Sequence, residues 1–520
     1  MGMLPFMDER GDEGPVAGMP LAFSPRDYQL AADAAVASYL TDHDRCGLYL
    51  ATGTGKTEIA FLLMSRCWDG MKLFIAPRRE LVRQTAERFR KRGLNVGIEM
   101  AADRSDEEIT VACYASLRSR NRYQRFLKGV KLVIVDEAHI NYSPDALDML
   151  KEFRSFGAKV VAMTASPPSK KNFILPEHYG EPAYIYSYMQ AVQDGYLVPC
   201  VMHLCVLDEL DLSRFKASFG DFDPGRLSKL MQRRANVAAV GAMVEKFWQC
   251  EPSVVFCASI AHAEAVRDDL TGRGIGASIV HSQMSQEEID LHLRDFATGN
   301  SNVIINVGIL TLGWDCPHIR NIFIARCTAS STLYTQVFRR GTRPLPGVVD
   351  RYNTAEERRA AIARSAKPCF KVYDITDSSR HNSIVTALDV LYPASDKVLM
   401  RRVRRRTEGQ QHTLDALDRI VEQERRALAA ETAAREREEM QRRKHISVGA
   451  SVSAYERDIS APTESRGDRR TAAREYRWMP FGRYRGKPFT KIPRQYLSAL
   501  LPHCRDKALS ESIRRFLSRG

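Results

Sequence analysis

The sequence predicts an α/β protein with two consecutive parallel sheets, followed by a long helix and a small basic module. Short apolar runs alternate with amphipathic segments, and this alternation stops near 190–199 and then restarts. Strands that alternate with helices form parallel sheets with helices on both faces. The composition changes after Lys397, and a chain of 520 residues has room for about three domains.

The first unit is expected over residues 21–190, after a leader (1–20) rich in Gly, Pro and acidic residues that we expect to be disordered. The segments 57–68 and 79–91 have the apolar spacing of helices. The strand candidates of this unit are Gly47–Ala51, Lys72–Ala76, Glu108–Ala112, Val130–Val135 and Lys159–Met163.

The second unit is expected over residues 200–396, after a connector with the sequence QAVQDGYLVP. Its architecture looks like a repetition of the first, although no simple sequence repeat is visible. Its strand candidates are Ser253–Cys257, Gly276–His281, Asn302–Val307, Ile319–Ala325 and Phe370–Ile375.

The last part of the chain has a different composition. Residues 397–446 are predicted to be a basic helical extension, because 412–444 lacks Gly and Pro and is rich in Ala, Glu and Arg. A linker rich in Ser, Thr and charged residues is expected over 447–475, and a small module over 476–520.

The positive charge is concentrated in this last part. Residues 401–520 hold 29 Lys and Arg against 16 Asp and Glu, a net charge of +13 out of +14 for the chain. Nucleic acid is the polyanion that most commonly uses such a segment, while the alternative is that the arginines only keep a helix soluble.

Several classes are excluded or disfavoured. No apolar run approaches the roughly 18 residues that cross a bilayer, and the N-terminus lacks the pattern of a secretory signal. The 11 cysteines contain no C-x-x-C pair, which favours buried thiols in a reducing compartment over a zinc site.

The strongest local signal is LYLATGTGKTEIA at 48–60, in which an apolar strand runs into a glycine-rich turn and then a helix. Glycines let the backbone wrap around phosphates, and the helix start offers free N–H groups. Lys56 would neutralise the β- and γ-phosphates, and the Thr57 hydroxyl would hold Mg²⁺. The rest of the predicted phosphate loop is Thr52, Gly53, Thr54 and Gly55.

A second signal is LVIVDEAHI at 132–140, in which a buried strand ends in two carboxylates, and we expect the phosphate loop on a neighbouring strand. Asp136 is expected to hold Mg²⁺ through water. Glu137 is expected to orient and deprotonate the attacking water.

Together these motifs resemble superfamily 2 helicases of the DEAD/DEAH-box type, and further segments follow in that family's order over about residues 22–385. The resemblance implies two RecA-like domains with ATP and Mg²⁺ between them. PRDYQ at 25–29 resembles the adenine-reading motif, with Arg26 and Gln29 at the nucleotide. GILTLGWD at 308–315 resembles motif V, with Thr311 at the strand and Gly313 and Asp315 at the nucleotide.

Other segments resemble the family's strand-contacting motifs. They are APRREL at 76–81, which supplies Arg78 and Arg79, and motif IV at 254–259, which supplies Ser259. TAS at 164–166 resembles motif III, which couples the nucleotide to the nucleic acid.

QVFRRGTR at 336–343 resembles motif VI, whose arginines cross the cleft between the domains. By family position, Arg340 and Arg343 are expected at the γ-phosphate, where an arginine finger contributes about 10³–10⁵ in rate. Arg339 stands where the family usually has Gly.

DEAH, the DGYLVP connector and GWDCP resemble the branch that holds type I restriction-enzyme motor subunits and bacterial repair helicases. The resemblance implies an ATP-dependent DNA helicase or translocase acting on single-stranded or forked DNA. We expect it in the cytoplasm of a bacterial or phage-infected cell, and the sequence leaves its oligomeric state open, with a monomer favoured. A duplex translocase, an RNA helicase, the motor of a restriction complex, and an adaptor with an inactive ATPase remain as alternatives.

The C-terminal module resembles a small module found on phage and bacterial proteins, with the sequence FGRYRGKPF at 481–489. Arg483, Arg485 and Lys487 would meet phosphates, and Tyr484 would stack on bases. The alternative is a small hairpin-and-helix fold with its aromatic residues in the core.

Overall fold

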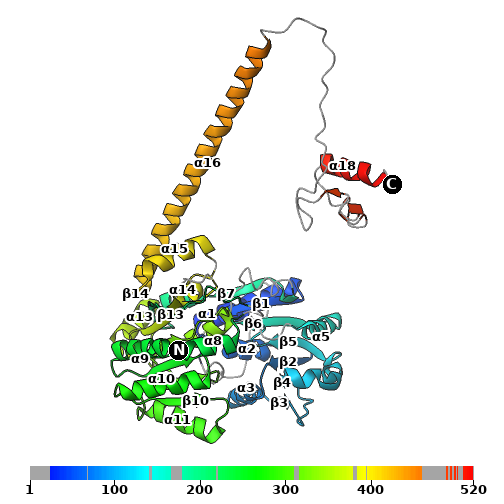
Figure 1. Ribbon diagram of the computed structural model, residues 1–520. Coiled ribbons are helices and arrows are strands. Elements are labelled where there is room, and N and C mark those ends of the chain that lie inside the picture. The colour runs from blue at the N-terminus through cyan, green and yellow to red at the C-terminus, as the bar shows by residue number, and fades with distance from the viewer. Residues whose placement is uncertain are drawn as a thin grey trace. The chain divides into compact units, whose positions relative to one another are not determined.

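Figure 1 presents the computed structural model of the chain, with two α/β lobes and the long helix α16. The structure describes residues 24–66, 68–139, 143–165, 178–217, 221–309, 316–378, 383–393, 395–458, 488–489, 492, 494, 497–498, 501 and 507–518. The expected leader, Thr311, Gly313, Asp315, and the basic and aromatic residues at 483–487 lie outside the described residues. The chain divides into two compact units, Met1–Thr432 and Ala433–Gly520.

The first lobe contains a seven-stranded parallel sheet in the order β3-β4-β2-β5-β6-β1-β7. Its central strands are buried on both faces, which explains why they are almost continuously apolar. The strands are β1 (Arg45–Leu50), β2 (Met71–Ala76), β3 (Val96–Glu99), β4 (Ile109–Cys113), β5 (Val130–Val135), β6 (Lys159–Thr164) and β7 (Pro182–Tyr186).

The second lobe repeats this plan with the order β10-β11-β9-β12-β13-β8-β14, in which only the edge strand β14 is antiparallel to its neighbour. The strands are β8 (Cys200–Leu207), β9 (Ser253–Cys257), β10 (Ser278–His281), β11 (Val303–Val307), β12 (Asn321–Ala325), β13 (Phe370–Asp377) and β14 (Gln411–Thr413).

Helices cover both faces of each sheet. In the first lobe they are α1 (Asp27–Asp42), α2 (Lys56–Ser65), α3 (Arg79–Lys91), α4 (Tyr114–Arg118), the 3₁₀ helix η1 (Ser119–Phe126) and α5 (Pro144–Ser155). The connector holds α7 (Tyr188–Gln193). In the second lobe they are α8 (Pro224–Met231), α9 (Arg234–Phe247), α10 (Ile260–Gly272), α11 (Gln286–Thr298), α12 (Ser331–Phe338), α13 (Ala355–Arg364), α14 (Ala387–Leu391) and α15 (Lys397–Thr407).

One hydrophobic cluster extends from the first lobe through the connector into the second. It includes Phe61 of α2, Leu197 of the connector and Phe338 of α12, all almost fully buried. The edge-to-face contact between Tyr188 and Phe338, with ring centroids 5.2 Å apart, ties the connector to the helix that leads into motif VI. The two lobes therefore share one apolar core.

Helix α16 (Leu414–Asp458) begins on the second lobe, where Leu417 and Val421 are buried. It confirms the long helix expected from the composition and continues past residue 446, where the sequence predicts the linker to begin. In the second unit, α18 (Lys507–Ser518) packs Ile513 with Phe489, Ile492 and Leu497. No helix in the described part of the chain is long and apolar enough to cross a bilayer.

The fold class expected from the sequence is confirmed: two parallel α/β sheets in tandem, followed by a long helix. The strands β3, β7, β8 and β14 lack a counterpart among the strand candidates. The strands β3, β7 and β14 are short and lie at sheet edges, where a few residues give little periodicity. Strand β8 is a largely apolar strand of eight residues next to an edge, and it was missed although it directly follows the expected connector.

Candidate nucleotide-binding site

The phosphate loop is built by the turn that joins β1 to α2. Gly53 and Gly55 have φ angles of +91° and +75°, a backbone region that suits glycine. A Cβ on Gly55 would lie 2.6 Å from the Gln29 side-chain nitrogen, so a side chain there would displace the Gln29 amide from the loop. Lys56 is the first residue of α2, and its helix N-terminus faces the loop.

Side chains of the PRDYQ segment form hydrogen bonds to this loop. The Tyr28 hydroxyl donates to the Thr54 carbonyl at 2.6 Å, and the Gln29 amide donates to the same oxygen at 3.2 Å. The Thr54 hydroxyl in turn donates to the Ala51 carbonyl at 2.5 Å. Gln29 therefore contacts the phosphate loop directly, and the role of Tyr28 was missed by the sequence reasoning although it sits inside the motif.

The acidic residues of DEAH follow β5, and β6 separates β5 from β1 in the sheet. The expectation of neighbouring strands was therefore wrong by one strand. The strand between them is useful to the site, because Thr164 at the end of β6 lies 2.8 Å from the His139 ring nitrogen Nδ1. The last residue of motif II, His139, and the first residue of motif III, Thr164, therefore meet within one lobe.

Glu137 has an unusual backbone for a residue that is not glycine, with a φ angle of +45°. Its N–H donates to the Asp136 carboxylate at 2.9 Å, and the next N–H, of Ala138, donates to the Met163 carbonyl at 3.0 Å. The turn holds the two neighbouring carboxylates in fixed, different orientations. Such strain is often found at functional sites.

The charges around these carboxylates separate their pKa values. Burial and the nearby charge of Glu137 raise the pKa of Asp136. Burial alone would raise the pKa of Glu137 as well, but the Lys56 ammonium and the Arg339 guanidinium outweigh it and lower that pKa. Burial lowers the pKa of Lys56, which Glu137 and Asp136 oppose. Glu137 is therefore the carboxylate that stays ionised near neutral pH.

Motif VI reaches this site from the second lobe. Arg339 pairs with the Glu137 carboxylate at 3.2 Å, and both side chains are more than nine-tenths buried. The Thr342 hydroxyl lies 3.4 Å from the Thr52 carbonyl, and Arg343 Cγ lies 3.3 Å from where a Cβ on Gly53 would stand. Arg340 directly follows Arg339 after the end of α12.

Arg339 is thus a site residue that the sequence reasoning did not assign. The available signal was its departure from the glycine usual at that position. Its partner could not be foreseen, because 202 residues separate Arg339 from Glu137 in the chain.

A buried lysine supports motif VI from behind. Lys367 is 1% exposed, and its ammonium donates to the carbonyls of Pro317 at 2.7 Å and Arg343 at 2.8 Å. Pro317 follows the GWDC segment, so the ammonium joins the chain after motif V to the backbone of Arg343. Nothing in the sequence near Lys367 pointed to this contact.

The other described residues that were expected at the nucleic acid, and Arg26, which was expected at the nucleotide, occupy separate places. Arg78 and Arg79 are exposed at the start of α3, beyond the end of β2. Ser259 caps α10 by accepting the His262 N–H, and it also accepts the Ser228 hydroxyl at 2.7 Å. The Arg26 guanidinium of the first lobe forms an ion pair with Asp350 of the second lobe at 2.9 Å.

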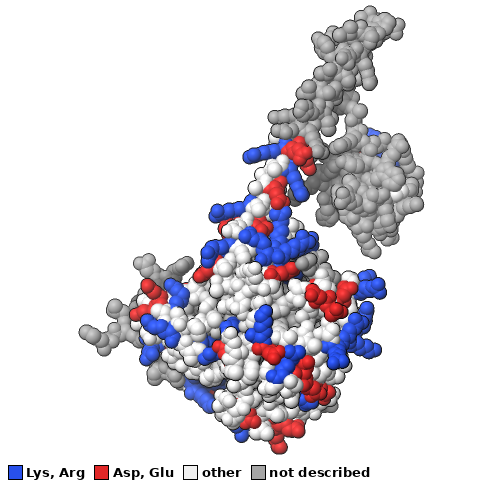
Figure 2. All heavy atoms as spheres, turned by 60° about the vertical axis from the view of Figure 1, so that its left-hand side comes forward, with Lys and Arg blue, Asp and Glu red and all other residues white. Residues whose placement is uncertain are grey.

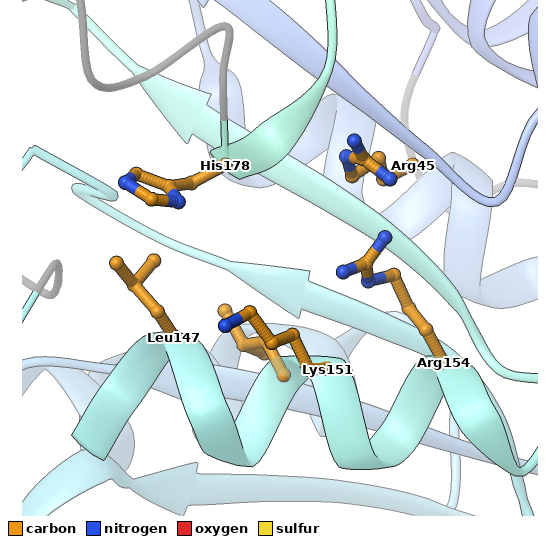
Figure 3. Close-up of a pocket in the computed structure, with 6 residues that line it drawn as sticks. Arg45, Leu147, Lys151, Arg154 and His178 are labelled. Carbon is orange, nitrogen blue, oxygen red and sulfur yellow. The ribbon is translucent and has the colours of Figure 1, made fainter. Parts of the chain in front are cut away.

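A pocket of about 290 Å³ lies elsewhere on the first lobe (Figure 3). Helix α5 supplies Leu147, Lys151 and Arg154, and Arg45 and His178 face them. Arg45 begins β1 whereas the phosphate loop follows its last residue, so the pocket lies at the opposite end of that strand. Arg45 and Arg154 both pair with Asp44, which balances much of the charge.

Two family descriptions match the chain. Residues 22–169 match the family described as "Type III restriction enzyme, res subunit", and residues 240–344 match "Helicase conserved C-terminal domain".

Curated relatives include a putative ATP-dependent helicase IRC3 of Saccharomyces cerevisiae, 29% identical over 61% of this chain and 49% of that protein. A type I restriction enzyme EcoAI endonuclease subunit of Escherichia coli is 26% identical over 62% of this chain and 44% of that protein. The chain spans about half the length of the curated relatives it matches.

The fold is also that of a solved protein. A fragment of a putative HsdR subunit of a type I restriction enzyme from Vibrio vulnificus YJ016 superposes with a TM-score of 0.53 at 24% identity, covering 69% of this chain and 66% of that one. This likeness shows the RecA-like fold of the two lobes.

Proposed function

Because the chain belongs to the superfamily 2 helicases, we propose that it is a nucleic-acid-dependent ATPase that moves along DNA and separates its strands. The observation that carries the proposal is the contact across the cleft, in which Arg339 and Arg343 of the second lobe meet Glu137 and the phosphate loop of the first. We further propose that residues 21–190 and 200–396 are the two motor domains.

The loop suits a nucleoside triphosphate with a divalent cation. A Cβ would fill the cradle at Gly55, and the Thr52 hydroxyl is buried without a hydrogen-bond partner among the described residues. In the proposed site, the N–H groups from Thr52 to Thr57 hold phosphate oxygens, and Lys56 neutralises the β- and γ-phosphates. Thr57 and Asp136 hold Mg²⁺, which neutralises charge on those phosphates when bound.

Glu137 is proposed to orient the attacking water and to accept its proton, a role that requires the ionised carboxylate. Arg340 and Arg343 are proposed to stabilise the charge that develops on the transferred phosphoryl group. Since these arginines belong to the second lobe, hydrolysis depends on lobe closure. Cycles of closing and opening would shift the grip on the strand.

DNA is the proposed track, single-stranded or forked, with Arg78, Arg79, Ser259 and Thr311 at the strand and the basic module over 476–520 as a further contact. Arg26, Gln29, Gly313 and Asp315 are proposed at the nucleotide. The restriction-enzyme relatives favour DNA, whereas an RNA track is the alternative that the experiment below would reveal.

The test compares ATP turnover with no nucleic acid, single-stranded DNA, duplex DNA, forked DNA and RNA, followed by strand displacement with the best activator. DNA is expected to stimulate turnover most. The Lys56→Ala variant is expected to lose turnover while still binding DNA. The control is Lys91→Ala, at a lysine 73% exposed at the end of α3.

Equal turnover by wild type and Lys56→Ala would overturn the proposal and favour an adaptor without ATPase activity. Stimulation by RNA alone would show that the track is RNA and not DNA.

A further inference from the structure

Helix α15 has an outer face that the motor site does not use. Its inner face is fixed to the second lobe by Leu399, Met400 and Val403, which are buried. Because a helix turns once in 3.6 residues, the opposite face is formed by Lys397, Val398, Arg401 and Arg405. All four are exposed. We call Lys397, Arg401 and Arg405 the basic row.

The other arginines of α15 are engaged in ion pairs. Arg402 pairs with Glu431 and Arg406 with Glu424, both on α16, while Arg404 pairs with Asp389 of α14. These contacts hold the helix in one orientation against its neighbours. None of the three residues of the basic row forms an ion pair with an acidic side chain in the part of the chain that the structure describes.

The sequence of α15 thus places its cations in two sets with different surroundings. Figure 2 shows Lys and Arg side chains gathered where α16 leaves the second lobe, the region that α15 occupies. From Lys397 to Arg405 the helix rises about 12 Å at 1.5 Å per residue. The basic row is therefore a straight line of charge on a rigid support.

From this arrangement we propose that the basic row binds the phosphate backbone of duplex DNA, next to the motor. This inference rests on the proposed function, which supplies DNA as the ligand, and it adds a contact outside the motor motifs. A duplex carries one charge per about 1.7 Å of its axis, so about 12 Å of helix faces several phosphates at once.

The composition of the face favours a duplex over a single strand. Sites for single strands combine cations with aromatic side chains on which bases stack. The outer face of α15 has no aromatic residue, and Val398 is its only uncharged side chain. Contacts to phosphates alone position a protein on a duplex without reading sequence.

The test measures binding of the full-length protein to a duplex, a fork with the same duplex, and a single strand over a range of salt concentrations. The variant carries Lys397→Gln, Arg401→Gln and Arg405→Gln. The matched control removes three exposed charges from the first lobe through Lys91→Gln, Lys128→Gln and Lys151→Gln. Urea unfolding of both variants checks that the fold is intact.

We expect the basic-row variant to bind duplex at least tenfold more weakly at low salt. The slope of log affinity against log salt should be smaller by about 2–3, because each lost phosphate contact removes about 0.9. ATP turnover at saturating duplex should equal that of the control, with more DNA needed for half-activation.

Duplex affinity and salt slope equal to those of the control would overturn the inference, and so would a loss confined to the single strand. Failure of the proposed function looks different, because the wild-type protein itself would then show no stimulation by any nucleic acid.

Discussion

Lys367 offers a sharp test of how the second lobe holds its arginines. Replacing it by Met keeps the apolar stem and removes the ammonium that donates to the Pro317 and Arg343 carbonyls. Because the side chain is 1% exposed, water cannot readily take the ammonium's place. A fully buried carbonyl left unsatisfied costs about 1–3 kcal/mol, and since these two bonds are partly buried we expect a total loss of about 2–3 kcal/mol in the free energy of unfolding of the second lobe.

Lys367→Met should also lower the rate of ATP turnover, beyond what the loss of folded protein explains. The Arg343 carbonyl belongs to the segment whose side chain reaches the phosphate loop. A displaced guanidinium weakens stabilisation of the transition state and leaves the phosphate loop itself unchanged. We therefore expect kcat for ATP to fall by about tenfold or more, at a temperature where the variant is folded, while KM changes little.

Lys371 provides the matched control, because it lies four residues further along the chain and its ammonium, which is partly exposed, pairs with Glu251 at 3.0 Å and donates to Gln249 at 3.2 Å. Lys371→Met should change the free energy of unfolding by about 1 kcal/mol or less and leave kcat unchanged. Urea unfolding and steady-state turnover give both quantities. The reasoning is refuted if Lys367→Met unfolds at the same urea concentration as Lys371→Met and turns over ATP at the wild-type rate.

Two further predictions concern the phosphate loop and a buried acid. Gly55→Ala should raise KM for ATP, because its Cβ would lie 2.6 Å from the Gln29 side-chain nitrogen. The control is Gly299→Ala, which has a similar φ of +83° and nothing within 4 Å of the added Cβ, and it should cost about 1 kcal/mol of stability without changing KM. Equal KM values for the two variants would contradict this prediction. Burial raises the pKa of Asp374 from 3.8 to about 7, so the folded state binds the proton more tightly than the unfolded chain. The resulting stability is present below about pH 4 and is lost as the pH rises through about 7. Urea midpoints from pH 4 to pH 8 should therefore fall more for wild type than for Asp374→Asn, and parallel pH profiles would exclude the effect.

Much of the fold and the site could be predicted from local patterns. The strand Val130–Val135 and the helix Arg79–Lys91 have the bounds expected from the sequence. The strand is a short apolar run, and the apolar residues of the helix recur with helical spacing. Lys56 and Asp136 could be predicted as site residues because each lies in its own short motif, a strand followed by a glycine turn for Lys56 and a strand that ends in carboxylates for Asp136.

The remaining features depend on residues that are distant in the chain. The sequence by itself determined two parallel sheets, the glycine turn after β1 and the acidic residues at the end of β5, because period and turn chemistry are local properties. Only the tertiary structure decided that β6 lies between β1 and β5, that Arg339 pairs with Glu137, and that Lys367 holds the Arg343 backbone. Strand order and side-chain pairing follow from how whole helices pack on a sheet, and no local spacing encodes that choice.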